Sequence, residues 1–336
     1  MQQKIVIFGG MGFIGQHLVR RLVDSSQSTE IVLADLDAAE RDFLFEDLSD
    51  LNCIKRISLD VRKYSEEWST LPQSGVETIY NFAAVHREPG HLHSEYFETN
   101  LKGARNVCRY AEDVGCLKII FTSSIAVYGA DGLPCSEDTL PQPRSAYGAS
   151  KLVAEEIHKA WAMENIKKSL TIVRPGVVYG KGENGNVTRL VRLVSKGFVP
   201  YFGNRTVVKS GCYVKNLICS ILEVSERVNH QILIYNMSFD PMPELQHYVK
   251  TISEVTEKRV ISLSVPRFFA LLCAKFFDLI ALILKISTPI NSVRYKKLVL
   301  ANHIIPQYLR SLNWIPPFTF KESFLDWKQE DPDLWN

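Results

Sequence analysis

Ser124, Tyr147 and Lys151 have side chains that could move a proton together. The stretch SAYGASK places Tyr147 and Lys151 four residues apart, which brings both side chains to one face of a helix. A phenol has a pKa of about 10, and a nearby ammonium favours the phenolate. We therefore expect the pKa of Tyr147 to fall to about 7, which takes roughly 4 kcal/mol. Tyr147 would then accept a proton from a sugar hydroxyl while the carbon loses a hydride, and Ser124 would hold the same oxygen.

A glycine-rich segment near the N-terminus could bind the hydride acceptor. GGMGFIG supplies Gly9, Gly12 and Gly15 between a β-rich run and a helical pattern. This spacing allows a tight turn and lets a pyrophosphate approach the backbone at a helix N-terminus. Asp35 ends the next β-rich run, where a carboxylate binds ribose hydroxyls and repels a 2′-phosphate, so NAD is favoured over NADP. The other residues expected to contact NAD in this part of the chain are Phe13, Ile14, Asp60, Val61, Ala83 and Ala84.

Alternating strands and helices must position these residues. Short β-rich runs occur at 4–8, 30–35, 53–60, 78–84, 117–124, 169–175 and 231–238, and helical patterns at 13–24, 95–113 and 147–163. This alternation predicts an α/β fold with a Rossmann-type doubly wound parallel sheet. We expect residues 1–175 with about 206–240 to form the NAD-binding domain. Residues from about 176 to 205 and 241–330 would form a smaller, mostly helical substrate lobe.

Composition excludes several other classes. The 336 residues have a formal net charge of +2, so no global attraction to nucleic acid is expected. Seven scattered cysteines without a C-x-x-C pair argue against a disulfide framework, and His91 and His93 lack a metal-binding frame, so we expect no metal. The chain shows no signal-peptide pattern, which favours a cytoplasmic location.

Four motifs, GGMGFIG, TSSIAVYG, YGASK and RPGVVYG, together resemble the extended short-chain dehydrogenase/reductases that act on nucleotide sugars, the NAD-dependent sugar epimerase/dehydratase family. The resemblance implies that Ser124, Tyr147 and Lys151 are the catalytic triad, and that Tyr147 and Lys151 also contact NAD. It further implies that Asn100 positions the cofactor and the active-site helix, and that Pro175 touches the nicotinamide. Relatives of this kind commonly form homodimers through helices like 95–113 and 147–163.

The residues after Ser124 discriminate between activities in this family. Sugar 4,6-dehydratases carry Asp-Glu there, whereas Ile125 and Ala126 cannot transfer protons. A 4-epimerase with retained NAD and an NAD(P)-dependent nucleotide-sugar 4-ketoreductase remain, and Asp35 favours the epimerase. A non-catalytic NAD-sensing scaffold would not need the three residues of the triad.

Further motifs indicate a substrate. AAVHREP, GNVTRLVRLVSKG, KSGCYVKNL and NSVRYKKL resemble the bacterial 4-epimerase that converts N-acetylglucosamine to N-acetylgalactosamine on undecaprenyl diphosphate, in polysaccharide and O-antigen precursor synthesis. The carrier, undecaprenyl diphosphate or UDP, stays open. His86, Ser124, Asn186 and Arg294 are the expected substrate contacts.

An apolar stretch at 267–286 raises the question of a membrane. Lys275, Asp278 and Lys285 interrupt it, which disfavours a membrane span. Two interpretations remain: a core helix of the substrate lobe, or a peripheral contact of residues 267–297 with the cytoplasmic face of the inner membrane.

Overall fold

The computed structural model describes residues 3–25, 29–49, 51–88, 90–129, 132–227, 230–266 and 300–336, together with Phe268, Phe269, Leu271, Leu272 and Lys275. Arg294 and most of the stretch 267–297 therefore lie outside the described residues. Among the helices that are described, none is long and apolar enough to cross a membrane.

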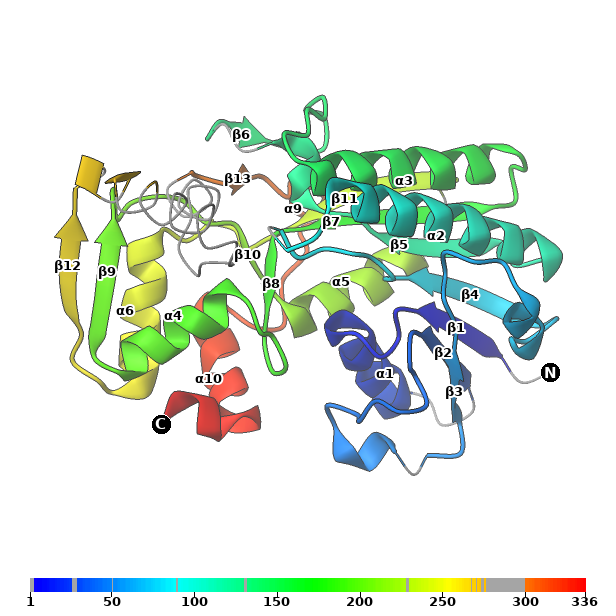
Figure 1. Ribbon diagram of the computed structural model, residues 1–336, viewed down its shortest axis with the longest axis horizontal. Helices are drawn as coiled ribbons and strands as arrows, with labels where there is room; N and C mark the ends of the chain where they lie inside the picture. Colours follow the sequence, from blue (N-terminus) through cyan, green and yellow to red (C-terminus); the bar gives the residue numbers. More distant parts are fainter. Residues whose placement is uncertain are drawn as a thin grey trace.

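A seven-stranded sheet forms the centre of the fold (Figure 1). The strands follow the order β11-β7-β5-β4-β1-β2-β3, and every neighbouring pair is parallel. The chain order reverses between β1 and β4, and the crevice at such a switch point binds ligands beyond the carboxyl ends of the strands. The strands are β1 (Lys4–Phe8), β2 (Glu30–Asp35), β3 (Ile54–Ser58), β4 (Val76–Asn81), β5 (Lys118–Thr122), β7 (Ser169–Pro175) and β11 (Ile232–Met237).

Helices cover both faces of this sheet because alternate strand residues are apolar on both sides. In β1, Val6 and Phe8 join a buried cluster that includes residues of α2 and α3, whereas Ile7 joins a cluster that includes residues of α1 and α5. Figure 1 shows the two pairs of helices on opposite sides of the strands. These helices are α1 (Phe13–Ser25), α2 (His93–Asp113), α3 (Ala146–Met163) and α5 (Val214–Arg227).

A third buried cluster lies away from the main sheet and is rich in aromatic side chains, among them Tyr179, Phe324, Trp327 and Trp335. It joins α4 (Asn186–Ser195), α6 (Leu245–Thr256), α10 (Phe320–Glu330) and η4 (Pro332–Trp335). Three two-stranded sheets belong to the same half of the chain or link it to the first: β8 (Val177–Tyr179) with β10 (Gly211–Tyr213), β9 (Phe198–Phe202) with β12 (Ile261–Val265), and β6 (Pro134–Cys135) with β13 (His303–Ile304).

Short elements complete the described chain: η1 (Glu46–Leu48), η2 (Glu66–Thr70), η3 (Ile125–Tyr128) and α9 (Gln307–Ser311). The expected Rossmann-type α/β fold is confirmed, and residues 231–238 do return to the main sheet as β11 beside β7. The domain boundaries drawn from the sequence stay a prediction.

Candidate active site

The glycine loop between β1 and α1 requires glycine at two positions. Gly9 has φ +75°, and a Cβ there would lie 2.7 Å from the backbone nitrogen of Ala83. A Cβ on Gly15 would lie 2.5 Å from the carbonyl oxygen of Gly9, so α1 starts in direct contact with the turn. The Gly12 N–H closes this turn by donating to the Gly9 carbonyl at 3.0 Å.

The loop has the shape that a dinucleotide phosphate needs. A Cβ on Gly12 would meet a single atom within 4 Å, the Gly9 carbonyl oxygen at 3.1 Å, so this backbone is open on its other side. Phe13 and Ile14 follow at the first turn of α1 and are half-buried. Because the first N–H groups of a helix lack partners within it, the open side of the loop and the start of α1 fit the diphosphate of NAD.

Asp35 stands at the carboxyl end of β2, beside the glycine loop. Its Oδ2 accepts a hydrogen bond from the Met11 N–H at 3.0 Å, and Arg41 Nη1 lies 3.6 Å from its Oδ1. Burial raises the pKa of the Asp35 carboxyl, although Arg41 and the backbone N–H groups act in the opposite direction. The side chain keeps an exposed fraction of 15%, so the carboxylate fits a ribose beside the loop.

Asp60 and Val61 follow β3 at the same edge of the sheet. Arg62 binds the Asp60 carboxylate through its Nε at 2.9 Å and its Nη2 at 2.8 Å, and this hydrogen bonding lowers the pKa of Asp60. Val61 is buried, and its carbonyl accepts from the Asn106 amide at 2.8 Å. Arg62 thus occupies the Asp60 carboxylate. A contact of Asp60 and Val61 with adenine stays a prediction.

The segment after β4 contains Ala83 and Ala84, both half-buried. Asn100 on α2 holds this segment in place. Its Oδ1 accepts from the Val85 N–H at 3.0 Å, and its Nδ2 donates to the Val85 carbonyl at 3.2 Å and to Ser150 Oγ at 2.8 Å. One buried amide therefore ties the loop after β4 to helix α3, on which Tyr147 lies.

Ser124 and Tyr147 meet at the end of β5. Ser124 caps η3 by accepting from the Ala126 N–H at 3.1 Å, and Ser145 caps α3 by accepting from the Gly148 N–H at 3.1 Å. Ser124 and Tyr147 thus lie at the starts of two packed helices, η3 and α3, and the Ser124 hydroxyl is near enough to the Tyr147 phenol to act on its pKa. A Cβ on Gly148 would lie 2.4 Å from the Ala126 carbonyl oxygen, which shows how closely η3 and α3 pack.

The expected lowering of the Tyr147 pKa is wrong for the protein as described. Burial of the phenol raises its pKa to about 12, the hydrogen bond with Ser124 opposes this rise, and the charge of Glu88 adds to it. The sequence-based expectation counted the attraction of an ammonium and of the positive nicotinamide ring but left out the cost of removing a phenolate from water. Since each pKa unit corresponds to about 1.36 kcal/mol, a pKa of 7 would require ~7 kcal/mol of added phenolate stabilisation.

Lys151 is buried with an exposed fraction of 2%. Its Nζ lies over the Phe121 ring, 4.2 Å from the centroid, and the pKa is lowered to about 7 because burial outweighs the attraction of Glu155. Near neutral pH the amine is therefore close to its titration midpoint. Pro175 ends β7 and is buried next to Gly176, at the same edge of the sheet.

Sequence reasoning missed a buried ion pair beneath this site. Arg174 Nε and Nη2 donate to the two carboxylate oxygens of Glu155, at 2.9 and 2.6 Å. The Ser123 hydroxyl donates to the same carboxylate. Glu155 lies one helical turn after Lys151, and Ser123 precedes Ser124, so this ion pair supports two residues of the expected triad from below. Arg174 is the one charged residue in the strand SLTIVRP, which is the signal that could have revealed the pair.

The polar network continues towards the C-terminal part of the chain. Arg174 Nη1 donates to the Tyr128 hydroxyl at 2.8 Å, which donates to Asn236 Oδ1 at 2.8 Å. The Asn236 N–H donates to Glu137 at 2.8 Å, and the same carboxylate accepts from the first two N–H groups of α9 at 3.0 and 3.2 Å. A chain of hydrogen bonds thus links the site to residues 307–308.

The expected substrate contacts do not form one described cluster. His86 is exposed on the loop between β4 and α2, and Asn186 is exposed at the first turn of α4, where its Oδ1 accepts from Arg189 at 3.4 Å. Arg294 lies outside the described residues. Lys209 was missed: its Nζ donates to the Leu300 carbonyl at 2.6 Å, and burial lowers its pKa to about 8.

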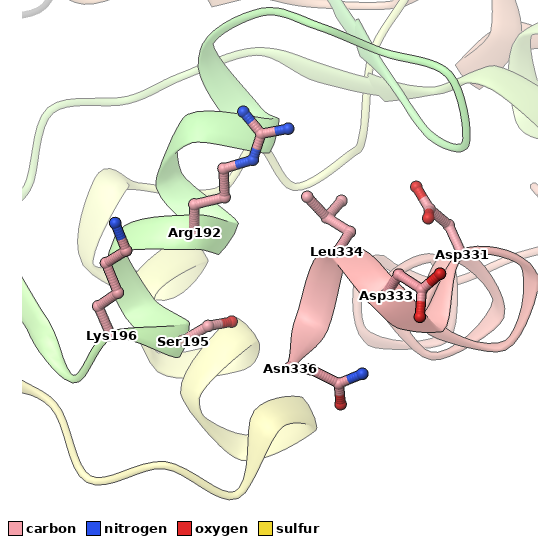
Figure 2. A pocket seen from close by; sticks show the side chains of 7 residues that line it. All are labelled: Arg192, Ser195, Lys196, Asp331, Asp333, Leu334 and Asn336. Carbon is pink, nitrogen blue, oxygen red and sulfur yellow. The ribbon is translucent and has the colours of Figure 1, made fainter.

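One hollow of about 400 Å³ lies elsewhere, between α4 and the C-terminal residues. Figure 2 shows Arg192, Ser195 and Lys196 on one side of it and Asp331, Asp333, Leu334 and Asn336 on the other. None of the expected site residues lines this hollow, so it is separate from the candidate active site.

Comparison with known proteins finds a matching family model and similar sugar epimerases. The model of the NAD dependent epimerase/dehydratase family matches residues 5–237. The chain is 28% identical over 323 residues to the N-acetyl-alpha-D-glucosaminyl-diphospho-ditrans,octacis-undecaprenol 4-epimerase of Escherichia coli O157:H7, covering 96% of this chain and 93% of that protein. It is 26% identical over 331 residues to the UDP-glucose 4-epimerase of Vibrio cholerae, covering 96% and 94%.

A solved structure is similar in fold over nearly the whole chain. The UDP-N-acetylglucosamine 4-epimerase of Methanobrevibacter ruminantium, in complex with UDP-N-acetylmuramic acid, aligns with a TM-score of 0.75 at 18% identity and covers 99% of both chains. At this identity the likeness concerns the fold alone.

Proposed function

The chain belongs to the NAD-dependent epimerase/dehydratase family and is an NAD-dependent enzyme of the sugar 4-epimerase type, and from this premise we propose that it interconverts N-acetylglucosamine and N-acetylgalactosamine carried on a diphosphate. The observation that carries the proposal is the proximity of Ser124 to Tyr147, near enough for the serine hydroxyl to act on the pKa of the phenol, at the edge of the sheet that holds the glycine loop. A sugar hydroxyl bound there would contact both the Tyr147 phenol, which can carry a proton, and the Ser124 hydroxyl.

In the proposed reaction NAD, when bound, would supply reversible hydride transfer. The residues of this chain handle the proton and the geometry. Tyr147 takes the proton of the sugar 4-hydroxyl at Oη and gives it back after the 4-keto sugar has turned over, while Ser124 holds the 4-oxygen. Lys151, buried one turn along α3 with a pKa of about 7, would add positive charge to the pocket in its protonated form. Tyr147 must be a phenolate to take this proton, so the proposed reaction needs the pKa of about 12 in the protein alone to be lowered, which the positive charge of bound NAD+ and of protonated Lys151 would favour.

Dehydration is disfavoured by the residues that follow Ser124. Ile125 and Ala126 begin η3, and neither has a group that can carry a proton. Water elimination from a sugar needs an acid and a base beside the leaving hydroxyl. The ketoreductase alternative is disfavoured within this proposal, because Asp35, if it binds the adenosine ribose, would repel the 2′-phosphate of NADP.

For the carrier we propose undecaprenyl diphosphate, with UDP as the second candidate. The proposal is supported by the similarity, over 96% of the chain, to the undecaprenol-linked 4-epimerase of Escherichia coli O157:H7. The UDP-glucose 4-epimerase of Vibrio cholerae is nearly as similar, which is why UDP stays in the test. Within this proposal His86, Asn186 and Arg294 contact the substrate, the enzyme acts as a homodimer, and it works in the cytoplasm at the inner membrane on precursors of a polysaccharide such as O-antigen.

The test is a product assay with both carriers. Purified protein is incubated with undecaprenyl-diphosphate-linked and with UDP-linked N-acetylglucosamine, and the released sugars are separated. N-acetylgalactosamine from either form supports the epimerase, and the preferred form identifies the carrier. Tyr147→Phe serves as the matched inactive control, since it removes one hydroxyl. If neither carrier form yields N-acetylgalactosamine, the proposed function is wrong.

A further inference from the structure

The two-stranded sheet β9–β12 has one face made entirely of apolar side chains. Alternate residues of a strand point to the same side, and partners in a parallel pair share that side. The register pairs Phe198 with Ile261, Pro200 with Leu263 and Phe202 with Val265. We call these six residues the outer face.

The opposite face of the same sheet is already packed. Val199 and Tyr201 of β9 are buried in the third cluster together with residues of α4 and α6, among them Val191, Ile252 and Val255. Figure 1 shows β9 and β12 at the end of the molecule away from the seven-stranded sheet, with α4 and α6 on their inner side. The outer face is therefore turned away from the rest of the described protein.

Three large apolar side chains of the outer face are exposed to solvent. Ile261 is 73% exposed, Leu263 55% and Phe198 44%. Just beyond β12, the exposed Phe268, Phe269 and Leu272 continue the apolar character along the chain. Large contiguous apolar surfaces on a soluble protein mark sites of interaction.

Cations border the outer face at both ends of the strands. Lys258 and Arg259 precede β12, and Lys275 lies beyond β12; all three are exposed. Arg205, which follows β9, lies instead at the opposite face, because its Nε and Nη2 donate to Ser264 Oγ at 3.0 and 2.8 Å and its guanidinium lies 4.8 Å from the Tyr201 ring centroid. The stretches 197–206 and 258–275 contain no Asp or Glu, and the preceding acid, Glu257, ends α6.

We propose that the outer face of β9–β12 docks this protein onto an anionic lipid surface, with the apolar side chains in the headgroup region and the bordering cations on the lipid phosphates. Each Lys or Arg near such a surface contributes about a fivefold gain in binding, and apolar side chains add to it. A second copy of the chain fits less well, because a two-fold contact through one patch would bring like charges together. The argument rests on this face and not on the proposed reaction.

Vesicle binding of the full chain tests the proposal. Protein is mixed with phosphatidylcholine vesicles containing about 30% phosphatidylglycerol, or none, and the bound fraction is measured by flotation. We expect binding to the anionic vesicles that weakens with salt. The double variant Ile261→Ser/Leu263→Ser should lower the partition coefficient about tenfold or more, and Lys258→Glu/Arg259→Glu should lower it by a similar factor.

The matched control is Ile166→Ser/Ile315→Ser, which changes two isoleucines that are 80% and 84% exposed elsewhere. It should bind vesicles like the wild type. NAD affinity, measured by cofactor titration, should be unchanged in all three variants, so failure of docking and failure of the proposed function are separable. Equal vesicle binding by wild type and Ile261→Ser/Leu263→Ser overturns the proposal. Absence of vesicle binding by the wild type also overturns the proposal. Self-association in light scattering that Ile261→Ser/Leu263→Ser abolishes, without vesicle binding, would show that the outer face binds a second copy of the chain instead.

Discussion

Replacing Lys151 by methionine should stabilise the fold at neutral pH while it removes activity. Methionine keeps the length of the side chain and its contact with the Phe121 ring but has no charge. The pKa of Lys151 falls from 10.5 to about 7 in the folded protein because of burial. At about 1.36 kcal/mol per pKa unit, this difference corresponds to ~5 kcal/mol of stability lost at pH 7, as an order of magnitude.

The dependence on pH has a definite sign. As the pH falls from 10.5 towards 7, the unfolded chain takes up a proton on Lys151 that the folded protein does not, so the wild type loses stability relative to Lys151→Met. Below the folded pKa of about 7 both states are protonated and the difference is constant. Between pH 7.5 and 9.5 the advantage of the variant should therefore shrink by about 1.4 kcal/mol per pH unit.

Urea unfolding of both proteins at a series of pH values from about 6.5 to 9.5 measures this difference. Lys102→Met, which changes an exposed lysine of α2, is the control for the loss of a positive charge and should stay within about 0.5 kcal/mol of the wild type. If Lys151→Met is no more stable than the wild type at pH 7, or if its advantage does not decrease with rising pH, the burial of a costly amine at this position is refuted.

Three further changes test other parts of the site. Tyr147→Phe should reduce turnover by about a thousandfold or more, since it removes the proton carrier, and should leave NAD affinity within about twofold. A product assay measures the turnover and a cofactor titration the affinity; unchanged turnover would mean that Tyr147 is not the proton carrier. Gly15→Ala should abolish NAD binding or folding, because the new Cβ would lie 2.5 Å from the Gly9 carbonyl oxygen, and normal NAD titration of this variant would contradict the close contact of α1 with the turn. Glu155→Gln should cost about 3–5 kcal/mol in urea unfolding by leaving Arg174 buried without a counter-charge, and a loss below about 1 kcal/mol would show that the ion pair is not needed for stability.

Local sequence patterns were enough to predict the strands of the sheet and helices α1, α2 and α3, but not α5. The run KIVIF followed by GGMGFIG marks a strand, a tight turn and a helix start within a few residues, and each signal acts over that distance. The helix at 147–163 was predicted from apolar spacing, and α3 covers Ala146–Met163. These elements depend on neighbouring residues, which a single sequence shows directly.

Features that depend on distant residues escaped prediction. Glu155 and Arg174 lie on different elements, and their contact arises only when α3 packs beside β7. The high pKa of Tyr147 has the same origin, because burial is a property of the assembled protein. The pairing of β9 with β12, which forms the outer face, joins segments about sixty residues apart and has no local signal.

The central claim, that a hydride leaves the sugar and returns to the same carbon, can be measured with a substrate carrying deuterium at C4 of N-acetylglucosamine. The diphosphate-linked sugar is incubated with the enzyme in ordinary water, and the isolated N-acetylgalactosamine is analysed by mass spectrometry and NMR. We predict that the deuterium is retained at C4 without net consumption of NAD. Loss of the label to water, or a product formed only while reduced cofactor is consumed, would contradict the account.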